Sequence, residues 1–398
     1  MNKYFRRFAR IANLRFFYEW GCIISKKKSY LCKDKPLYAL RNMDKNLYCV
    51  IMAGGVGSRF WPVSRKHTPK QFLDILGTGK SFIRHTYERF AGMIPAENFL
   101  VVTNGAYADL VAEHLPELSR EQILCEPVGR NTAPCIAYAA FRLAALNPNA
   151  TMVVSPADHL ILDEQEFRSN IAECVDFVRT HDSLMTLGIV PSRPDTGYGY
   201  IQVGDRGGIS PVKTFTEKPN LQLAESFVAS GEFVWNAGIF VWQNATILRE
   251  LKNYLPEQYN LFNAEREQFA TPAENDAIGR IYPQCKSISI DYGVLERSSQ
   301  VYVRCCDFGW SDLGTWASLY QNSAKDEAGN VADAGSLLSN TTNCIVRHSA
   351  DKLVVVDGLD DYIVVDTDDV LLVYPKSREQ DIKQVTNRLQ FEGGDKYL

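Results

Sequence analysis

Nine residues near the start of the chain, Gly54-Gly55-Val56-Gly57-Ser58-Arg59-Phe60-Trp61-Pro62, come directly after an apolar run at residues 48–53. The length and composition of that run predict a buried β-strand, so the glycines lie at the carboxyl end of a strand. Open α/β sheets bind their ligands at this position. Glycines leave backbone N–H groups accessible to a phosphate, and Arg59 and Lys70 add cationic donors nearby. We therefore interpret the stretch as a phosphate-binding loop.

Two common phosphate-binding motifs do not fit this stretch. A Walker A loop requires Gly-x-x-x-x-Gly-Lys-Ser/Thr, and a dinucleotide-binding fingerprint requires a third glycine where Phe60 stands. The glycines alone are also compatible with a tight turn that only closes the strand. Arg59, Pro69 and Lys70 favour phosphate binding over that structural alternative.

The motif Gly-Gly-x-Gly-x-Arg, followed by Pro69-Lys70, resembles the signature of the sugar-nucleotide pyrophosphorylases, a family of nucleotidyltransferases. The longer strings at residues 60–65 and 69–73 resemble the mannose-1-phosphate guanylyltransferase branch of that family. The resemblance covers nearly everything from Met43 to the end of the chain. It implies catalytic roles for Arg59 and Lys70. It also implies nucleotide contacts at Gly54, Gly55 and Gly57.

Predicted strands and helices alternate at short intervals after the glycines, which is typical of a mostly parallel sheet with right-handed crossovers. The predicted strands are residues 99–103, 122–127, 151–159 and 184–189, and the predicted helices are residues 81–90, 107–115, 132–146 and 164–179. The predicted fold class is therefore α/β, with a Rossmann-like, mixed and mostly parallel sheet.

The third predicted strand ends at Glu126-Pro127, and Arg130-Asn131-Thr132-Ala133-Pro134 then opens a long apolar helix. Asn131 or Thr132 can cap that helix, and a helix amino terminus favours an anion or a polar base edge. An ordinary capped helix would use the same residues. The resemblance implies that Glu126, Asn131 and Thr132 meet the guanine and the ribose.

Two aspartates follow predicted strands, Asp158 in Pro-Ala-Asp-His and Asp312 in Trp-Ser-Asp-Leu-Gly. A cap or turn role is the structural alternative for both. The resemblance implies that Asp158 and Asp312 are the two carboxylate ligands of a Mg²⁺ ion. His159 either orients Asp158 or packs, because no second histidine is close enough in sequence to suggest a metal-binding pair.

Four residues of the central part of the chain are candidates for sugar-phosphate binding. From spacing alone, the tract around Gly199 is compatible with a hairpin turn, and Glu217-Lys218 with an exposed surface pair. Asn236 lies within an apolar run, where a buried amide must find hydrogen-bond partners. The resemblance implies a hexose 1-phosphate pocket formed by Gly199, Glu217, Lys218 and Asn236.

Composition bounds the class of protein. The chain has 398 residues, 45% hydrophobic and 23% charged, which fits a globular protein of two domains or one domain with an appendage. No apolar run approaches the roughly 18 residues of a membrane span, so no membrane segment is predicted. The ten cysteines include no Cys-x-x-Cys pair, which gives a zinc or redox site no support and favours a cytoplasmic location.

Charge is distributed unevenly along the chain. Residues 1–42 carry eleven Lys or Arg against two acidic residues, a net of +9, which leaves −13 for the remainder of a chain whose total is −4. The acidic main body argues against a nucleic-acid partner. The basic leader is compatible with a targeting arm, but its apolar patches are short and broken by charge. We expect Met43 to be the physiological start and residues 1–42 to lie outside the fold.

Beyond residue 329 the composition changes. Short valine-rich runs, separated by Asp and Gly turns, recur about every nine or ten residues at residues 343–346, 353–356, 362–365 and 370–373. They predict a β-rich appendage at residues 329–398, similar to a left-handed β-helix, after a catalytic domain at residues 43–328. We expect this appendage to pack and to support a homodimer rather than to catalyse. The chain ends too early for the additional isomerase domain of bifunctional relatives, so we expect the transferase alone.

The resemblance implies transfer of GMP from GTP to mannose 1-phosphate, with GDP-mannose and pyrophosphate as products. Another nucleotide or hexose 1-phosphate is the first alternative, because a few contacts decide the base. A catalytically silent regulator that binds sugar nucleotides is the second, although Arg59, Lys70, Asp158 and Asp312 are all present. A nicotinamide-dependent enzyme lacks the required glycine spacing.

Overall fold

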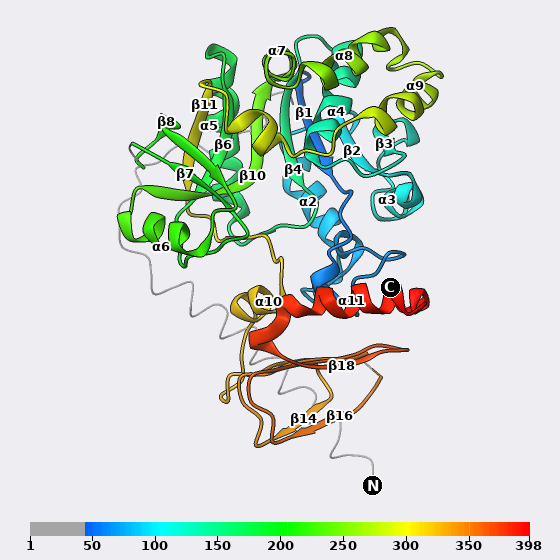
Figure 1. The fold of residues 1–398 in the computed structure, drawn as a ribbon, viewed down its shortest axis with the longest axis vertical. Coiled ribbons are helices and arrows are strands. Elements are labelled where there is room, and N and C mark those ends of the chain that lie inside the picture. Colours follow the sequence, from blue (N-terminus) through cyan, green and yellow to red (C-terminus); the bar gives the residue numbers. More distant parts are fainter. Residues whose placement is uncertain (1–43, 205, 350) are drawn as a thin grey trace. The chain divides into compact units, whose positions relative to one another are not determined.

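The computed structural model describes residues 44–204, 206–349 and 351–398 (Figure 1). The basic leader and the predicted start at Met43 lie outside these residues. In the part of the chain that the structure describes, no helix is long and apolar enough to cross a membrane.

A twisted central sheet carries the first part of the fold. Its main path runs β3-β2-β1-β4-β10-β6-β11-β8. Parallel ladders join β1 to β2 and β4, β2 to β3, and β6 to β11, whereas β10 is antiparallel to both β4 and β6. The bounds are β1 (Leu47–Met52), β2 (Phe99–Asn104), β3 (Ile123–Glu126), β4 (Thr151–Pro156), β6 (Leu184–Ile189), β8 (Ile209–Pro211), β10 (Phe233–Gln243) and β11 (Val301–Cys306). The predicted α/β fold with a mixed, mostly parallel sheet is confirmed.

Helices cover both faces of this sheet because alternate strand residues point to opposite sides. Val50, Val102 and Val154 pack into one core cluster with α4, whereas Ile51 and Val153 pack into a second cluster with α5. The helices are α2 (Phe82–Ala91), α3 (Ala108–His114), α4 (Thr132–Leu146), α5 (Glu164–Thr180), α6 (Leu221–Ser230), α7 (Asn244–Tyr254), α8 (Pro256–Ala264) and α9 (Glu274–Ile281). Burial on both faces explains why the strands appear in the sequence as continuous apolar runs.

Two short pairings position the loops at the carboxyl ends of the strands. β7 (Gly199–Gln202) pairs antiparallel with β9 (Thr214–Glu217) and with β10, so the tract around Gly199 is a sheet extension. β5 (Leu160–Ile161) pairs with β12 (Trp310–Ser311), which brings together the chain after Asp158 and the chain before Asp312.

The C-terminal region is a stack of short strands. β13 (Val331–Ala332), β15 (Ile345–Arg347) and β17 (Tyr362–Asp366) form one parallel ladder, and β14 (Ser336–Ser339) and β16 (Val354–Asp357) form another. β18 (Leu371–Pro375) adds antiparallel to β17, and α11 (Ile382–Phe391) follows it beside the stack (Figure 1). The predicted β-rich appendage is confirmed, and from β13 to β17 successive strands alternate between the two ladders.

This appendage shares a hydrophobic core with the glycine-rich loop. Phe60 and Trp61 pack in one buried cluster with Trp316 of α10 (Trp316–Asn322) and with Ile345 and Ile382 of the appendage. The indole Nε1 of Trp61 also donates a hydrogen bond to the carbonyl of Tyr397 at 2.7 Å.

An ion pair reinforces the contact. Arg65, which is 8% exposed, donates from Nη1 to Asp369 Oδ2 at 2.8 Å and from Nη2 to Asp369 Oδ1 at 2.5 Å. Its Nε donates to the carbonyl of Pro62 at 2.8 Å. The Phe-Trp-Pro-Val-Ser-Arg string therefore holds the appendage against the catalytic loops.

Asp369→Asn is expected to lower the melting temperature at neutral pH, because an amide cannot accept two charged hydrogen bonds from Arg65. Hydrogen bonding from Arg65 lowers the pKa of Asp369 to about 2. A pKa that is lower in the folded state contributes stability above the unfolded pKa near 4, and this stability is lost as the pH falls through about 2. The difference in melting temperature should hold from pH 8 to pH 5 and shrink below pH 4. The control is Asp368→Asn, at the exposed neighbouring position; equal losses in both variants would contradict the assignment.

Candidate active site

The predicted site residues gather at the carboxyl edge of the sheet. The glycine-rich loop follows β1, Glu126 ends β3 and Asp158 follows β4, so three strands of the parallel stretch β3-β2-β1-β4 deliver them. Parallel strands that end at one edge bring residues distant in sequence into a common site.

The three glycines of the loop have different surroundings. A Cβ at Gly57, whose φ is +73°, would lie 2.5 Å from Lys70 Cβ, whereas a Cβ at Gly55 would meet nothing within 4 Å. Gly54 and Gly55 are exposed, and Arg59 is exposed beside them. Gly57 therefore permits close packing on Lys70, while Gly54 and Gly55 leave backbone open to a ligand.

Lys70 is buried beneath this loop, with 2% of its surface exposed. Its Nζ donates hydrogen bonds to the Asp158 carboxylate Oδ2 at 2.9 Å, the Asp158 carbonyl at 3.1 Å and the Asp312 carbonyl at 2.7 Å. The aromatic rings of Phe60 and Phe82 lie 5.6 and 5.2 Å from Nζ. All three ammonium protons are used, so Lys70 joins the Asp158 and Asp312 loops.

The two predicted metal carboxylates are each fixed by a neighbour. Asp312 Oδ1 accepts hydrogen bonds from the Tyr198 hydroxyl at 2.7 Å and from the Gly314 N–H at 3.0 Å. Burial raises the pKa of Asp158, but the charges of Lys70 and His159 and the hydrogen bond from Lys70 outweigh it, and the pKa lies below its usual value. Each carboxylate is thus held by hydrogen bonds, and Lys70 joins the two loops that carry them.

The His159 ring is held by its neighbour Trp310. Its Nδ1 accepts a hydrogen bond from the Trp310 indole Nε1 at 3.2 Å, and the two rings meet edge to face at 5.5 Å. Burial lowers the pKa of His159, which favours the neutral ring. Sequence reasoning missed Tyr198 as a partner of Asp312, because a tyrosine between glycines indicates a sugar loop as readily as a carboxylate partner.

Glu126 lies at the predicted nucleotide end of the site, buried with 5% exposure. Its Oε1 accepts a hydrogen bond from the Tyr282 hydroxyl at 3.0 Å. Burial raises the pKa of Glu126 to about 7, and the Tyr282 hydrogen bond opposes that rise. Asn131, with φ 67°, caps α4 by accepting from the Thr132 N–H, and the Thr132 hydroxyl accepts from the Ile290 N–H at 2.9 Å.

The predicted sugar residues form a second acidic cluster. Lys218 Nζ donates to Glu217 Oε1 at 2.6 Å, and a Cβ at Gly199 would lie 2.4 Å from Glu217 Oε2. Asn236 Nδ2 donates to Asp291 Oδ1 at 2.9 Å. Sequence reasoning missed Asp291, although a carboxylate in the run Ser289-Ile290-Asp291-Tyr292 next to buried residues was a usable signal.

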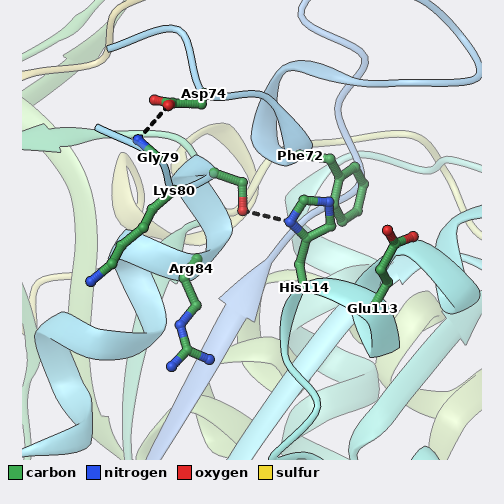
Figure 2. Close-up of a pocket in the computed structure, with 8 residues that line it drawn as sticks. Phe72, Asp74, Gly79, Lys80, Arg84, Glu113 and His114 are labelled. Carbon is green, nitrogen blue, oxygen red and sulfur yellow. Dashed lines mark hydrogen bonds between the residues drawn. The ribbon is translucent and has the colours of Figure 1, made fainter. Parts of the chain in front are cut away.

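One cavity lies apart from these residues. It encloses about 420 Å³ beside the start of α2 (Figure 2). Several of its polar groups are paired: Asp74 accepts from the Gly79 N–H, and Ser81 and His114 share a hydrogen bond (Figure 2). Arg84 pairs with Glu117. A smaller cavity of about 130 Å³ adjoins Tyr198, on the side of Trp235 and Trp310. Of these two cavities, the larger is the one that lies away from the predicted site.

Comparisons with known proteins identify the family. A model described as nucleotidyl transferase matches residues 48–329, and one described as a MannoseP isomerase/GMP-like beta-helix domain matches residues 337–389. The chain is 39% identical over 355 residues to the alginate biosynthesis protein AlgA of Pseudomonas aeruginosa, covering 86% of this chain and 72% of that one. It is 38% identical over 363 residues to a mannose-1-phosphate guanylyltransferase of Escherichia coli K12, covering 87% and 74%. A solved structure from Thermus thermophilus, described as a mannose-1-phosphate geranyltransferase, superposes with a TM-score of 0.78 at 29% identity, over 87% of this chain and 99% of that one.

Gly57→Ala is expected to reduce the free energy of unfolding by about 1–3 kcal/mol, because it adds a clash with Lys70 and a strained positive φ. Gly55→Ala has neither defect and is expected to change it by less than about 0.5 kcal/mol. Denaturant unfolding of both variants measures the difference. Equal destabilisation would show that the two glycines are conformationally equivalent.

Proposed function

The chain belongs to the nucleotidyl transferase family, and on this premise we propose that it transfers GMP from GTP to α-D-mannose 1-phosphate, forming GDP-mannose and pyrophosphate. The observation that carries the proposal is the 38% identity to a mannose-1-phosphate guanylyltransferase over 87% of the chain. The site agrees with it, since one sheet edge holds an open glycine loop, paired carboxylates, a buried glutamate and an acidic cluster.

The reaction needs positioning more than proton transfer. A phosphate monoester has a second pKa near 6, by analogy with phosphoamino acids, and is mostly ionised at neutral pH. Its oxygen attacks the α-phosphorus of GTP, a new O–P bond forms, and the bond to pyrophosphate breaks. The protein must therefore hold the two substrates in line and stabilise charge on the leaving group.

We assign the phosphate contacts to the open part of the glycine loop. The exposed backbone of Gly54 and Gly55 would receive the phosphates of GTP, and exposed Arg59 would contact the leaving pyrophosphate. Lys70 contributes its charge from below the loop and keeps Asp158 and Asp312 in place. Lys218, half exposed at the mouth of the acidic cluster, would hold the phosphate of the sugar.

Enzymes of this family generally use a divalent metal ion. We propose Mg²⁺, with Asp158 and Asp312 as its protein ligands. The described residues contain no group of three or more His, Cys, Asp or Glu side chains arranged for a metal. Two carboxylates fit Mg²⁺, which keeps several waters and takes further oxygens from substrate phosphates. The ion would neutralise phosphate charge in the site.

We propose that Glu126 reads the base. An ionised carboxylate only accepts hydrogen bonds, and guanine presents N1–H and a 2-amino group as adjacent donors, whereas adenine has an acceptor at N1. Tyr282 occupies one side of Oε1, and a Cβ at Gly54 would lie 3.2 Å from Oε2, which places the carboxylate beside the glycine loop. A GTP molecule whose base lies at Glu126 would therefore have its phosphates on the glycine loop.

The test of the function is pyrophosphate release by the purified chain with Mg²⁺. Four nucleoside triphosphates are crossed with mannose 1-phosphate and glucose 1-phosphate. GTP with mannose 1-phosphate is expected to exceed every other pair by at least about tenfold in kcat/KM, and chelation of the metal is expected to abolish release. A different winning pair would overturn the base or sugar assignment. The absence of pyrophosphate release with every pair would overturn the transferase proposal and favour a regulator.

A base-reading role for Glu126 predicts a pH dependence. Because burial raises its pKa to about 7, kcat/KM for GTP should rise with pH up to about 7 and then level, as the accepting carboxylate forms. Glu126→Gln should lose that rise and much of the preference for GTP over ATP. The pH profile of either enzyme also reports the ionisation of the substrate itself. The relevant readout is therefore the ratio of kcat/KM in the wild type to kcat/KM in the variant at each pH. Glu121→Gln, at an exposed position before β3, is the control. A ratio independent of pH would contradict the role.

A further inference from the structure

The acidic cluster at the sugar end contains two carboxylates, of which sequence reasoning identified one. We propose that Asp291 is a specificity-determining residue that acts with Glu217 as a pair of acceptors for neighbouring hydroxyls of the hexose. The proposal rests on the proposed function and adds to it the way in which the sugar ring is recognised.

Asp291 begins η9 (Asp291–Leu295), a π-helical turn. Hydrogen bonds connect the region of this turn to the nucleotide side and to the sugar side of the site. On the nucleotide side, the preceding Ile290 N–H donates to the Thr132 hydroxyl at 2.9 Å. On the sugar side, the Tyr292 hydroxyl donates to the Glu217 carbonyl at 3.3 Å, and the Glu217 N–H donates to Glu296 Oε1 at 2.7 Å. These bonds hold the Asp291 carboxylate against β9.

The amide of Asn236 fixes which atoms face Asp291. Its Oδ1 accepts from the Thr186 hydroxyl at 2.8 Å and from the Gly238 N–H at 3.1 Å. Both partners donate, so the amide nitrogen must point the other way, where it donates to Asp291 Oδ1 at 2.9 Å. Asn236 is therefore a positioning residue for Asp291.

Glu217 supplies the observation that points to a ligand. Its side chain is 6% exposed, and its Oε2 is buried with no hydrogen-bond partner among the described residues. The atom points toward Gly199, where a Cβ would lie 2.4 Å away. A buried carboxylate oxygen without a donor is costly, and a ligand donor would remove that cost.

The charge of the cluster selects the class of ligand group. Lys218 is the cation paired with Glu217, and its side chain is 53% exposed. Burial, followed by the charge of Glu217, raises the pKa of Asp291 to about 7. A phosphate would be repelled by this pair, whereas hydroxyls are neutral donors. Because the charge of Glu217 reaches Asp291, the two carboxylates fit two hydroxyls on adjacent ring carbons, one for each acceptor.

The experiment compares wild type with Asp291→Asn, using mannose 1-phosphate and its 2-, 3- and 4-deoxy analogues. In the variant, KM for mannose 1-phosphate is expected to rise about 10- to 100-fold, because one acceptor is lost from a polar site. KM for GTP should change by less than about twofold, since the nucleotide lies elsewhere. For at least one deoxy analogue, the kcat/KM of the wild type should be lower than its kcat/KM for mannose 1-phosphate. Asp291→Asn should lower the value for that analogue only a little further.

Two controls separate recognition from folding. Glu296→Gln, on the same turn, keeps an acceptor for the Glu217 N–H and should leave the discrimination between analogues intact. Thermal unfolding should show that Asp291→Asn is folded.

In one contrary result, the loss of kcat/KM caused by Asp291→Asn and the loss caused by removing a hydroxyl simply add for every analogue. In another, KM for GTP rises as much as KM for mannose 1-phosphate. Either result would show that Asp291 only supports the fold. A wild-type enzyme inactive with all hexose 1-phosphates would instead overturn the proposed function, and this inference with it.

Discussion

One buried ammonium group organises the phosphate end of this site. Lys70 Nζ donates to both an oxygen of the Asp158 side chain and the carbonyls of Asp158 and Asp312, so a single charge joins two loops that are distant in sequence. A buried lysine without such partners would be strongly unfavourable, and the same holds for a partly buried Asp158 without a cation. Each charge therefore requires the other, and their pairing joins the loops that carry Asp158 and Asp312. Gly57 belongs to this constraint, because its missing Cβ is what allows the loop to close over Lys70.

The appendage stabilises the same loops from the other side. Arg65, which follows the glycine-rich segment in sequence, pairs with Asp369 of the appendage. Glu379 of the appendage accepts a hydrogen bond from the Ala317 N–H, in the first turn of α10, at 2.6 Å. The loop carrying Asp312 leads directly into that helix. A change in the packing of the appendage would thus be transmitted to the residues proposed to hold the metal. The two architectures meet near residue 329, but the buried cluster of Phe60, Trp316 and Ile345 crosses that boundary. The homodimer expected from the sequence stays a prediction.

Much of the fold could be predicted because burial on both faces leaves a strong local signal. The strand at residues 184–189 and the helix at 132–146 coincide with β6 and α4. The site was harder, because its partners are set by packing between distant segments. Lys70 was predicted as a phosphate contact because it follows the glycines closely in sequence. In the structure its ammonium group donates hydrogen bonds to Asp158 and Asp312. Tyr198 and Asp291 were missed for the same reason, since Asp312 lies 114 residues from Tyr198, and Asn236 lies 55 from Asp291. Periodicity within a segment carries no information on such pairs.

The two ends of the site differ in electrostatic character, and this difference bears on how mannose 1-phosphate would be oriented. At the phosphate end, Arg59 is exposed and Lys70 lies beneath the loop, so anionic oxygens are favoured there. At the sugar end, Glu217 and Asp291 outnumber Lys218, so a phosphate is repelled and hydroxyl donors are favoured. Lys218 is bonded to Glu217 and half exposed. A sugar phosphate bound with its hydroxyls on the carboxylates would keep its phosphate away from them and free to meet a cation. The reversed orientation would bring its phosphate against two buried carboxylates and its hydroxyls against cations. Charge distribution alone therefore favours the orientation in which the hydroxyls meet Glu217 and Asp291 and the phosphate meets the cations.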